Sequence, residues 1–212
     1  MRVRPMSEVG LENCPNPNHW ERRDGDVVLE HPVMGSIVSV AVCNDDGTPR
    51  YDQFLHTEPI GAITVPVNTD GEIGLIEIER VSFKFGAEQV WPITDFSALG
   101  EVSIEIPRGA PRKGEAAKQT ALREGQEELN SPILSVEQIG MLTPNTTFHP
   151  HRIPVYHVRV DHRREGPIPL DVNERILKVR WHPEAQVRDL IRRGKIYCAM
   201  TLAALAMHLA RA

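Results

Sequence analysis

The sequence has few cysteines and no long hydrophobic segment. Its three cysteines, Cys14, Cys43 and Cys198, lie far apart and form no Cys-x-x-Cys pair, which argues against a disulfide framework and against a zinc ribbon. No apolar run approaches the roughly 18–20 residues that a membrane-spanning helix needs. The first twenty residues contain no apolar stretch like that of a secretory signal. We therefore expect a cytoplasmic protein without a membrane partner.

Basic residues do not outnumber acidic ones. The chain has 24 lysines and arginines against 29 aspartates and glutamates, a net charge of -5, so we expect no nucleic-acid partner held by phosphate neutralisation. The 41% of hydrophobic and 25% of charged residues are typical of a soluble globular protein. An acidic protein can still act on phosphorylated molecules when metal cations bridge the like charges.

Strand-like segments surround one central helix-forming segment. Alternating, β-branched sequence predicts strands over 35–43, 61–67, 72–79, 101–107, 133–142, 153–160 and 175–181. Asn68-Thr69-Asp70-Gly71, between the second and third of these segments, predicts a hairpin turn. Residues 115–129 have a helix-forming composition, the tail reads as two helices broken at Gly194, and residues 1–25 read as an arm or loop. Strands and helices do not alternate regularly, so we predict an α+β fold, a sandwich with a mixed sheet, rather than a doubly wound parallel sheet.

The central helix has an acidic face. Glu124, Glu127 and Glu128 fall at positions i, i+3 and i+4, where they are neighbours that repel one another in water. Charge clusters of this kind are often solvated surface. A divalent hard cation would turn the repulsion into attraction, because Mg²⁺ binds carboxylate oxygens, waters and substrate phosphates. Arg123 beside Glu124 could orient a carboxylate by a bidentate contact, and Gly125 within the helix suggests close approach of another segment.

The spacing of these residues resembles the Nudix box, G-x5-E-x7-R-E-U-x-E-E-x-G-U, in which U is apolar. Its six glycine, glutamate and arginine anchors up to the second Glu of the Glu-Glu pair are matched by Gly109, Glu115, Arg123, Glu124, Glu127 and Glu128. The sequence departs from the box at Gly125, Asn130 and Ser131. Asn130 is a small change, since a helix-ending left-handed residue is most often Gly and next most often Asn.

The resemblance extends on both sides of the box. Glu105-Ile106-Pro107-Arg108-Gly109 is similar to the Glu-x-Pro-x-Gly lead-in of the ADP-ribose pyrophosphatase branch, and the hairpin that ends at Arg80 resembles that branch's Gln-Tyr-Arg hairpin without its Gln and Tyr. This likeness implies a Nudix hydrolase domain over 61–212, an α/β/α sandwich with a mixed sheet. It implies a β-rich N-terminal extension over 1–60, which that branch uses to form homodimers.

The resemblance also implies an activity. It is Mg²⁺-dependent hydrolysis, with Mn²⁺ as a substitute, of the diphosphate bond of ADP-ribose or a related nucleoside diphosphate sugar, a small molecule. Glu124 and Glu128 would be the main metal ligands, with Glu127 sharing and the carbonyl of Arg108 completing the site. The other implied roles are substrate binding by Arg80 and Glu105, and support of the loop and helix by Gly109, Glu115 and Arg123. The general base would come from a late loop, as Glu174 or its competitor Asp171.

Other interpretations stay open at this point. The box binds metal and diphosphate rather than base or sugar, so a GDP-sugar or a dinucleotide is an alternative substrate, and a non-catalytic nucleotide-sensing module is another alternative. Trp91 and Phe96 could stack on an adenine or pack over a loop. The spacing of His149, His151, His157 and His162 forms no helical His-x3-His pair, so we expect no zinc site, and we expect His157 to be a half-buried strand residue.

Overall fold

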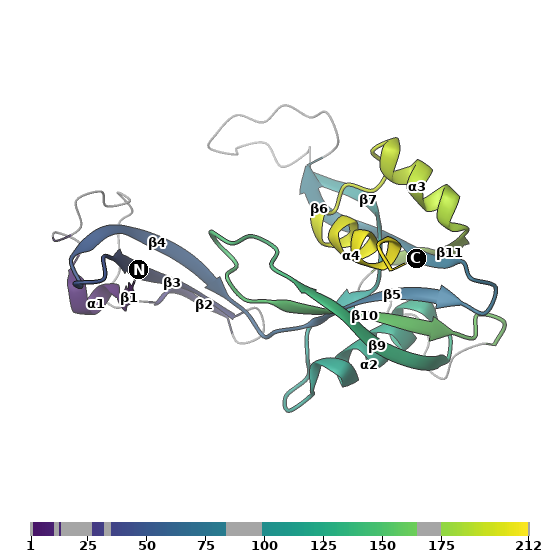
Figure 1. The fold of residues 1–212 in the computed structure, drawn as a ribbon, viewed down its shortest axis with the longest axis horizontal. Coiled ribbons are helices and arrows are strands. Elements are labelled where there is room, and N and C mark those ends of the chain that lie inside the picture. The colour runs from purple at the N-terminus through teal and green to yellow at the C-terminus, as the bar shows by residue number, and fades with distance from the viewer. Residues whose placement is uncertain are drawn as a thin grey trace. The chain divides into compact units, whose positions relative to one another are not determined.

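The structure, a computed structural model, describes residues 2–10, 13, 27–31, 35–83, 99–164 and 175–211. The chain divides into two compact units. The first comprises residues 1–60 with 143–152, and the second comprises 61–142 with 153–212 (Figure 1). Residues 143–152 therefore belong to the first unit, although the chain on either side of them belongs to the second.

The first unit contains an antiparallel sheet built around one long strand. Its elements are β1 (Arg2–Pro5), α1 (Met6–Val9), β2 (Val27–His31), β3 (Gly35–Cys43) and β4 (Pro49–Thr57). Strand β4 pairs along one edge of β3, whereas β2 and β1 pair in succession along the other edge. The prediction of an arm or loop over residues 1–25 is wrong for β1 and α1, because β1 is stabilised by pairing with a strand about forty residues later rather than by its own sequence pattern.

The second unit contains a mixed sheet and three helices, which confirms the α+β prediction. Its elements are β5 (Ala62–Asn68), β6 (Ile73–Phe83), β7 (Leu99–Glu105), β8 (Arg108–Gly109), α2 (Ala117–Leu129), β9 (Ile133–Leu142), β10 (Ile153–Val160), β11 (Ile176–His182), α3 (Glu184–Arg192) and α4 (Ala199–Leu209). The strand order is β11-β6-β5-β10-β9, with β7 beside β6 and β8 beside β5. Strands β5 and β10 run parallel, and the other pairs are antiparallel.

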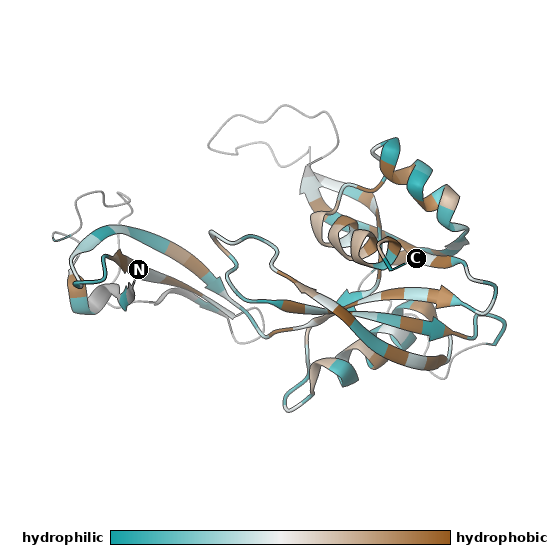
Figure 2. Cartoon of the chain, viewed as in Figure 1, coloured by the Kyte–Doolittle hydropathy of each residue, from teal (hydrophilic) through white to brown (hydrophobic). Residues whose placement is uncertain are grey.

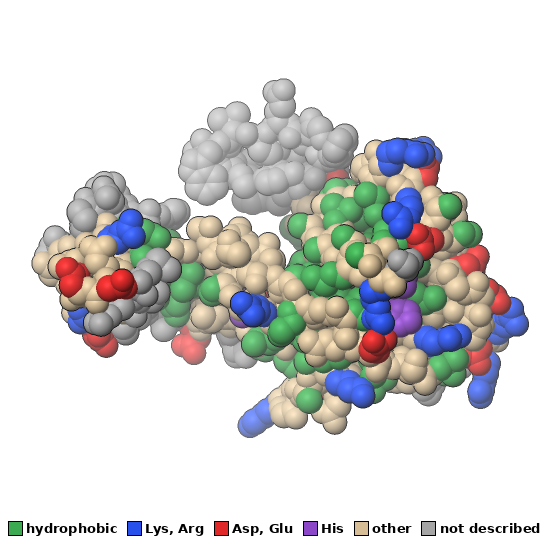
Figure 3. All heavy atoms as spheres, in the orientation of Figure 1, with side chains coloured by type: hydrophobic (Ala, Val, Ile, Leu, Met, Phe, Trp, Pro, Cys, Tyr) green, Lys and Arg blue, Asp and Glu red, His purple; other side chains and the backbone are tan. Residues whose placement is uncertain are grey.

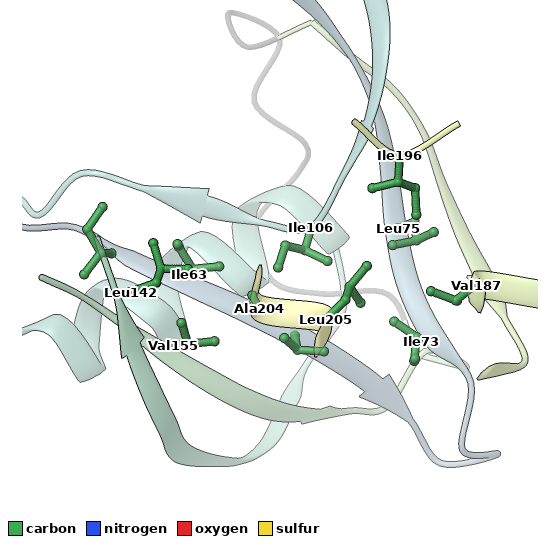
Figure 4. Close-up of a cluster of buried hydrophobic side chains, with 12 residues drawn as sticks. Ile63, Ile73, Leu75, Ile106, Leu142, Val155, Val187, Ile196, Ala204 and Leu205 are labelled. Atoms are coloured by element: carbon green, nitrogen blue, oxygen red, sulfur yellow. The ribbon is translucent and has the colours of Figure 1, made fainter. Parts of the chain in front are cut away.

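The central strands of this sheet carry buried apolar side chains on both faces, since successive side chains of a strand point to opposite faces and helices pack on each. On one face Ile63, Leu75 and Val155 pack with residues of α3 and α4 (Figure 4). On the other face the strand residues of a second apolar cluster pack with Ala121 and Leu129 of α2. Helix α4 is largely apolar along its length and α3 is more polar (Figure 2). The layers are therefore helix, sheet, helix, as predicted.

Local chemistry explains where the elements around the acidic helix begin and end. The predicted hairpin is confirmed, since the side-chain oxygen of Asn68 accepts from the backbone N–H groups of Asp70 and Glu72, both at 2.9 Å. The predicted strand over 101–107 ends earlier, at Glu105. The carbonyl of Pro107 instead accepts from the backbone N–H of Thr64 at 2.9 Å. Helix α2 ends at Asn130, whose φ of 46° is left-handed, as expected from the residue type.

The surface is mixed in charge. On the face of the second unit drawn in Figure 3, lysine and arginine side chains are interspersed with acidic and apolar ones. None of the helices within the described residues has the length and apolar character that crossing a membrane would require.

Candidate active site

Arg123 is the centre of an ion-pair network on helix α2. Its guanidinium donates two hydrogen bonds of 2.9 Å to Glu115, one of 2.7 Å to Glu124 and one of 2.8 Å to Glu127. It also donates to the carbonyl of Ala110 at 2.9 Å. Only 13% of the side chain is exposed, so solvent screens these contacts weakly. Arg123 thus fixes three carboxylates and the preceding loop in one arrangement.

The pKa values of Arg123 and Glu115 are both shifted by the two hydrogen bonds that join them. The hydrogen bonds from Arg123 lower the pKa of Glu115 to about 2, against a smaller opposing effect of burial. The same bonds, Glu115 first, raise the pKa of Arg123. The backbone N–H of Arg112 at 2.8 Å and the hydroxyl of Thr120 at 3.2 Å add to the carboxylate's partners. Glu115 is therefore a charged anchor of the loop at neutral pH.

Gly109 is a glycine for a steric reason. A Cβ built on it would lie 2.0 Å from Cδ and 2.1 Å from Oε1 of Glu124, far inside van der Waals contact. The carboxylate of Glu124 thus lies directly against the backbone of β8. Gly61 has a related role, because a Cβ there would lie 2.2 Å from the carbonyl oxygen of Gly109. The two glycines let the paired strands and the helix approach closely.

The remaining two glutamates complete the acidic face. Glu128 is 1% exposed and Glu124 is 8% exposed, whereas Glu127 lies nearer to solvent. The guanidinium of Arg112, itself largely exposed, donates to Glu127 at 2.9 Å. Sequence reasoning missed Arg112, which matches no fixed position of the box. The acidic face together with Glu115 therefore contains four carboxyl groups and two guanidinium groups.

This arrangement suits a hard divalent cation. The side-chain atoms of the three helix glutamates that could bind a metal are all carboxylate oxygens. Mg²⁺ and Mn²⁺ prefer these ligands over nitrogen or sulfur. Carboxyl groups outnumber guanidinium groups, so a cation would lower their mutual repulsion. The residues that could hold the cation are Glu124, Glu127 and Glu128. Of these, Glu127 also forms ion pairs with Arg112 and Arg123.

A second charged group lies beside β8. Arg80 of β6 donates to the carboxylate of Glu105 at 3.0 Å through Nη2 and at 3.3 Å through Nε. The guanidinium of Arg108 lies 3.0 Å from the same carboxylate. Glu105 is almost completely buried, whereas Arg80 and Arg108 are partly exposed. The structure thus brings together three of the predicted site residues. Their net charge is positive, and the two guanidinium groups are the exposed part.

A cavity opens next to this group. It has a volume of about 480 Å³, which is within the range of small-molecule sites. Its lining consists of Glu79, Arg80, Val81, Gly100, Glu101, Val102 and Arg175.

Some predicted residues lie outside the described part of the chain. These are the candidate bases Glu174 and Asp171 and the aromatic residues Trp91 and Phe96. Among the histidines, His157 is half-buried on β10, as predicted, and stacks on His208 with ring centroids 5.3 Å apart. Burial and the neighbouring His208 lower the pKa of His157.

A model of the NUDIX domain matches residues 58–200. Among solved structures, the crystal structure of an ADP compounds hydrolase resembles this chain with a TM-score of 0.63 and 17% sequence identity, over 87% of this chain and 89% of that one. At this identity the likeness shows the fold alone. No curated protein sequence matches the chain.

Proposed function

The chain belongs to the NUDIX domain family, and from this premise we propose that it hydrolyses the diphosphate bond of ADP-ribose or a related nucleoside diphosphate sugar. The products are a nucleoside monophosphate and a sugar phosphate. The observation that carries the proposal is the acidic face of α2, with the carboxylate of Glu124 held against Gly109 by close packing. The solved structure that shares this fold is described as an ADP compounds hydrolase, and the proposal extends that substrate class to this chain.

Three glutamates hold the metal in this proposal. Glu124 and Glu128 are the main ligands, Glu127 shares, and the carbonyl of Arg108 completes the site. Bound Mg²⁺, or Mn²⁺ in its place, supplies positive charge that offsets the negative charge of the reacting diphosphate. Arg123 acts as a positioning residue, because its hydrogen bonds hold Glu124 and Glu127 at defined places on the helix.

The group formed by Arg80, Glu105 and Arg108 binds the substrate. Guanidinium groups form paired hydrogen bonds with phosphate oxygens. Glu105 holds both guanidiniums from its buried position, which reduces the side-chain entropy that they lose when an anion binds. The adjacent cavity of about 480 Å³ has room for the part of the substrate beyond the diphosphate.

The general base is Glu174, with Asp171 as its competitor three residues earlier in the chain. A positioned base removes the proton of the attacking water and typically contributes about 10²–10⁴-fold to the rate.

Incubation with ADP-ribose and Mg²⁺ tests the proposal, with AMP and ribose 5-phosphate as the expected products. Glu128→Gln removes a proposed metal ligand at nearly constant shape, so we expect it to abolish turnover while the protein stays folded. Glu137→Gln is the matched control, since Glu137 is exposed and pairs with Arg211 away from the acidic face. If Glu128→Gln turns over ADP-ribose as fast as an active Glu137→Gln, the assignment of Glu128 as a metal ligand is refuted. A parallel panel with a GDP-sugar and a dinucleotide ranks the substrates.

We also propose that the first unit mediates homodimer formation. It consists largely of one antiparallel sheet, and the resemblance implies that extensions of this kind join two chains. Sedimentation at micromolar concentration provides the test, and a monomer there would overturn the proposal.

A further inference from the structure

A cluster of imidazole and carboxylate groups lies in the first unit and has no part in the proposed hydrolysis. It consists of His56 at the end of β4, Glu58 two residues later, and His149 from the segment 143–152. One ligand atom from each of the three residues lies within 4.8 Å of the other two. We propose that this cluster binds a divalent transition-metal ion of the Zn²⁺ type.

The backbone brings the ligands together from two distant segments. His56 lies in β4 and Glu58 directly follows that strand, whereas His149 and His151 lie on the facing segment. Oε1 of Glu58 lies 3.5 Å from Nδ1 of His149 and 3.1 Å from Nε2 of His151. The backbone N–H of His56 donates to the carbonyl of Phe148 at 2.7 Å. The two pairs of side chains therefore project into the same space.

The facing segment is itself ordered by local hydrogen bonds. The side-chain oxygen of Asn145 accepts from the backbone N–H groups of Thr147 at 2.9 Å and Phe148 at 3.2 Å. The backbone N–H of His149 donates to the carbonyl of Asn145 at 2.7 Å. The ring of Phe148 stacks on that of His56. These contacts fix the two histidines before any ion binds, which lowers the entropy cost of binding.

The distances suit tetrahedral coordination. Nδ1 of His56 lies 3.2 Å from Nε2 of His149. Zn–N bonds of about 2.0–2.1 Å at tetrahedral angles place two ligand nitrogens about 3.3 Å apart. A carboxylate oxygen of Glu58 lies within 4.8 Å of a ring nitrogen of each histidine, and rotation of the Glu58 side chain would bring it closer to complete the set. His56, Glu58 and His149 are all partly buried, and they lie next to one another.

His151 supports the ligand set from outside. Its Nε2 lies 3.1 Å from Oε1 of Glu58, and only 13% of its side chain is exposed. Hydrogen-bonding partners of ligating carboxylates fix their orientation and raise metal affinity. His151 is therefore a positioning residue for Glu58.

The donor set distinguishes this cluster from the acidic face of α2. Two imidazoles and one carboxylate form a set that binds Zn²⁺ and leaves a fourth position for water. Mg²⁺ prefers oxygen ligands alone, which the three helix glutamates offer and the cluster does not. The expectation of no zinc site was based only on the lack of a His-x3-His pair of helical spacing. It missed this cluster because His56 and His149 are 93 residues apart in the sequence.

Zn²⁺ titration of the full-length, tag-free chain tests the proposal. The titration is followed by calorimetry after metal removal, with excess Mg²⁺ present to occupy the acidic face. We expect one equivalent to bind to the wild type and to the control variant His182→Ala, whose imidazole contacts only Gln186 among the described contacts. We expect binding to be lost in His149→Ala and weakened about 10–100-fold in His151→Ala.

The proposal is overturned if the wild type binds no Zn²⁺ saturably, or if His149→Ala binds it as the wild type does. A spectroscopic measurement on the wild type keeps the test decisive if the variants fail to fold. The imidazole ¹⁵N resonances of His56 and His149 should shift when Zn²⁺ is added, and those of His182 should not. Shifts confined to histidines outside the cluster would equally overturn it.

Discussion

Replacement of Gly109 by alanine should disable the acidic face without changing any charged residue. Carbon atoms in contact are normally about 3.5–4.0 Å apart, whereas the new Cβ would lie 2.0 Å from Cδ of Glu124. The carboxylate would have to move by about 1.5 Å to restore normal contact. Gly109 does not have a positive φ, so alanine is tolerated by the backbone and the effect is steric.

The displacement is large compared with the tolerance of a catalytic site. Mg²⁺ holds its oxygen ligands at about 2.0–2.1 Å in near-ideal octahedral geometry, and a misplacement of about 1 Å can cost about 10²-fold in rate. We therefore expect kcat/KM for ADP-ribose to fall by at least about 10²-fold. Overpacking should also lower the free energy of unfolding by about 1–3 kcal/mol, which urea denaturation measures.

Gly125→Ala is the matched control for this prediction. Gly125 neighbours Glu124 on the same helix, but its Cβ would meet only the tip of Ile133, at 3.3 Å. The substitution gains helix propensity of about 1 kcal/mol, which offsets the small shift required of the Ile133 side chain, so stability and activity should remain near those of the wild type. Gly109→Ala with wild-type kcat/KM would refute the steric account of the site.

Two further predictions concern charge. Since the pKa of Glu115 falls from 4.5 to about 2 on folding, its contribution to stability is complete above pH 4.5 and is lost as the pH falls toward 2. Urea denaturation should thus show a difference between wild type and Glu115→Gln that narrows with acidification, and a constant difference would contradict this. Glu174→Gln should lower kcat about 10²–10⁴-fold with little change in substrate affinity. If Asp171→Asn alone has that effect, then Asp171 is the base.

The sequence predicted the parts of this protein that depend on local chemistry. The central helix, its end at Asn130 and the hairpin at Asn68 follow from residues within a few positions of one another. At Gly125 the neighbour is the side-chain tip of Ile133 in the next strand, 3.3 Å from an added Cβ. These features have short-range causes, which explains why a single sequence was sufficient.

Features that depend on distant pairing were missed. Strand β1 was read as part of an arm because its partner β3 lies far along the chain. The bond from Arg112 to Glu127 joins a loop to a helix and has no fixed spacing in the motif. The cluster around His56 and His149 joins segments of the first unit that are 93 residues apart. In each case the interaction joins segments that are apart in the sequence, so no local sequence pattern predicts it.

The initial rate of AMP release from ADP-ribose as a function of Mg²⁺ concentration tests the proposed metal site directly. We expect no release in EDTA, a rate that rises to saturation as Mg²⁺ is added, and restoration by Mn²⁺. A rate that is unchanged by EDTA would contradict the central claim, because the carboxylates of Glu124, Glu127 and Glu128 would then be acting without a metal.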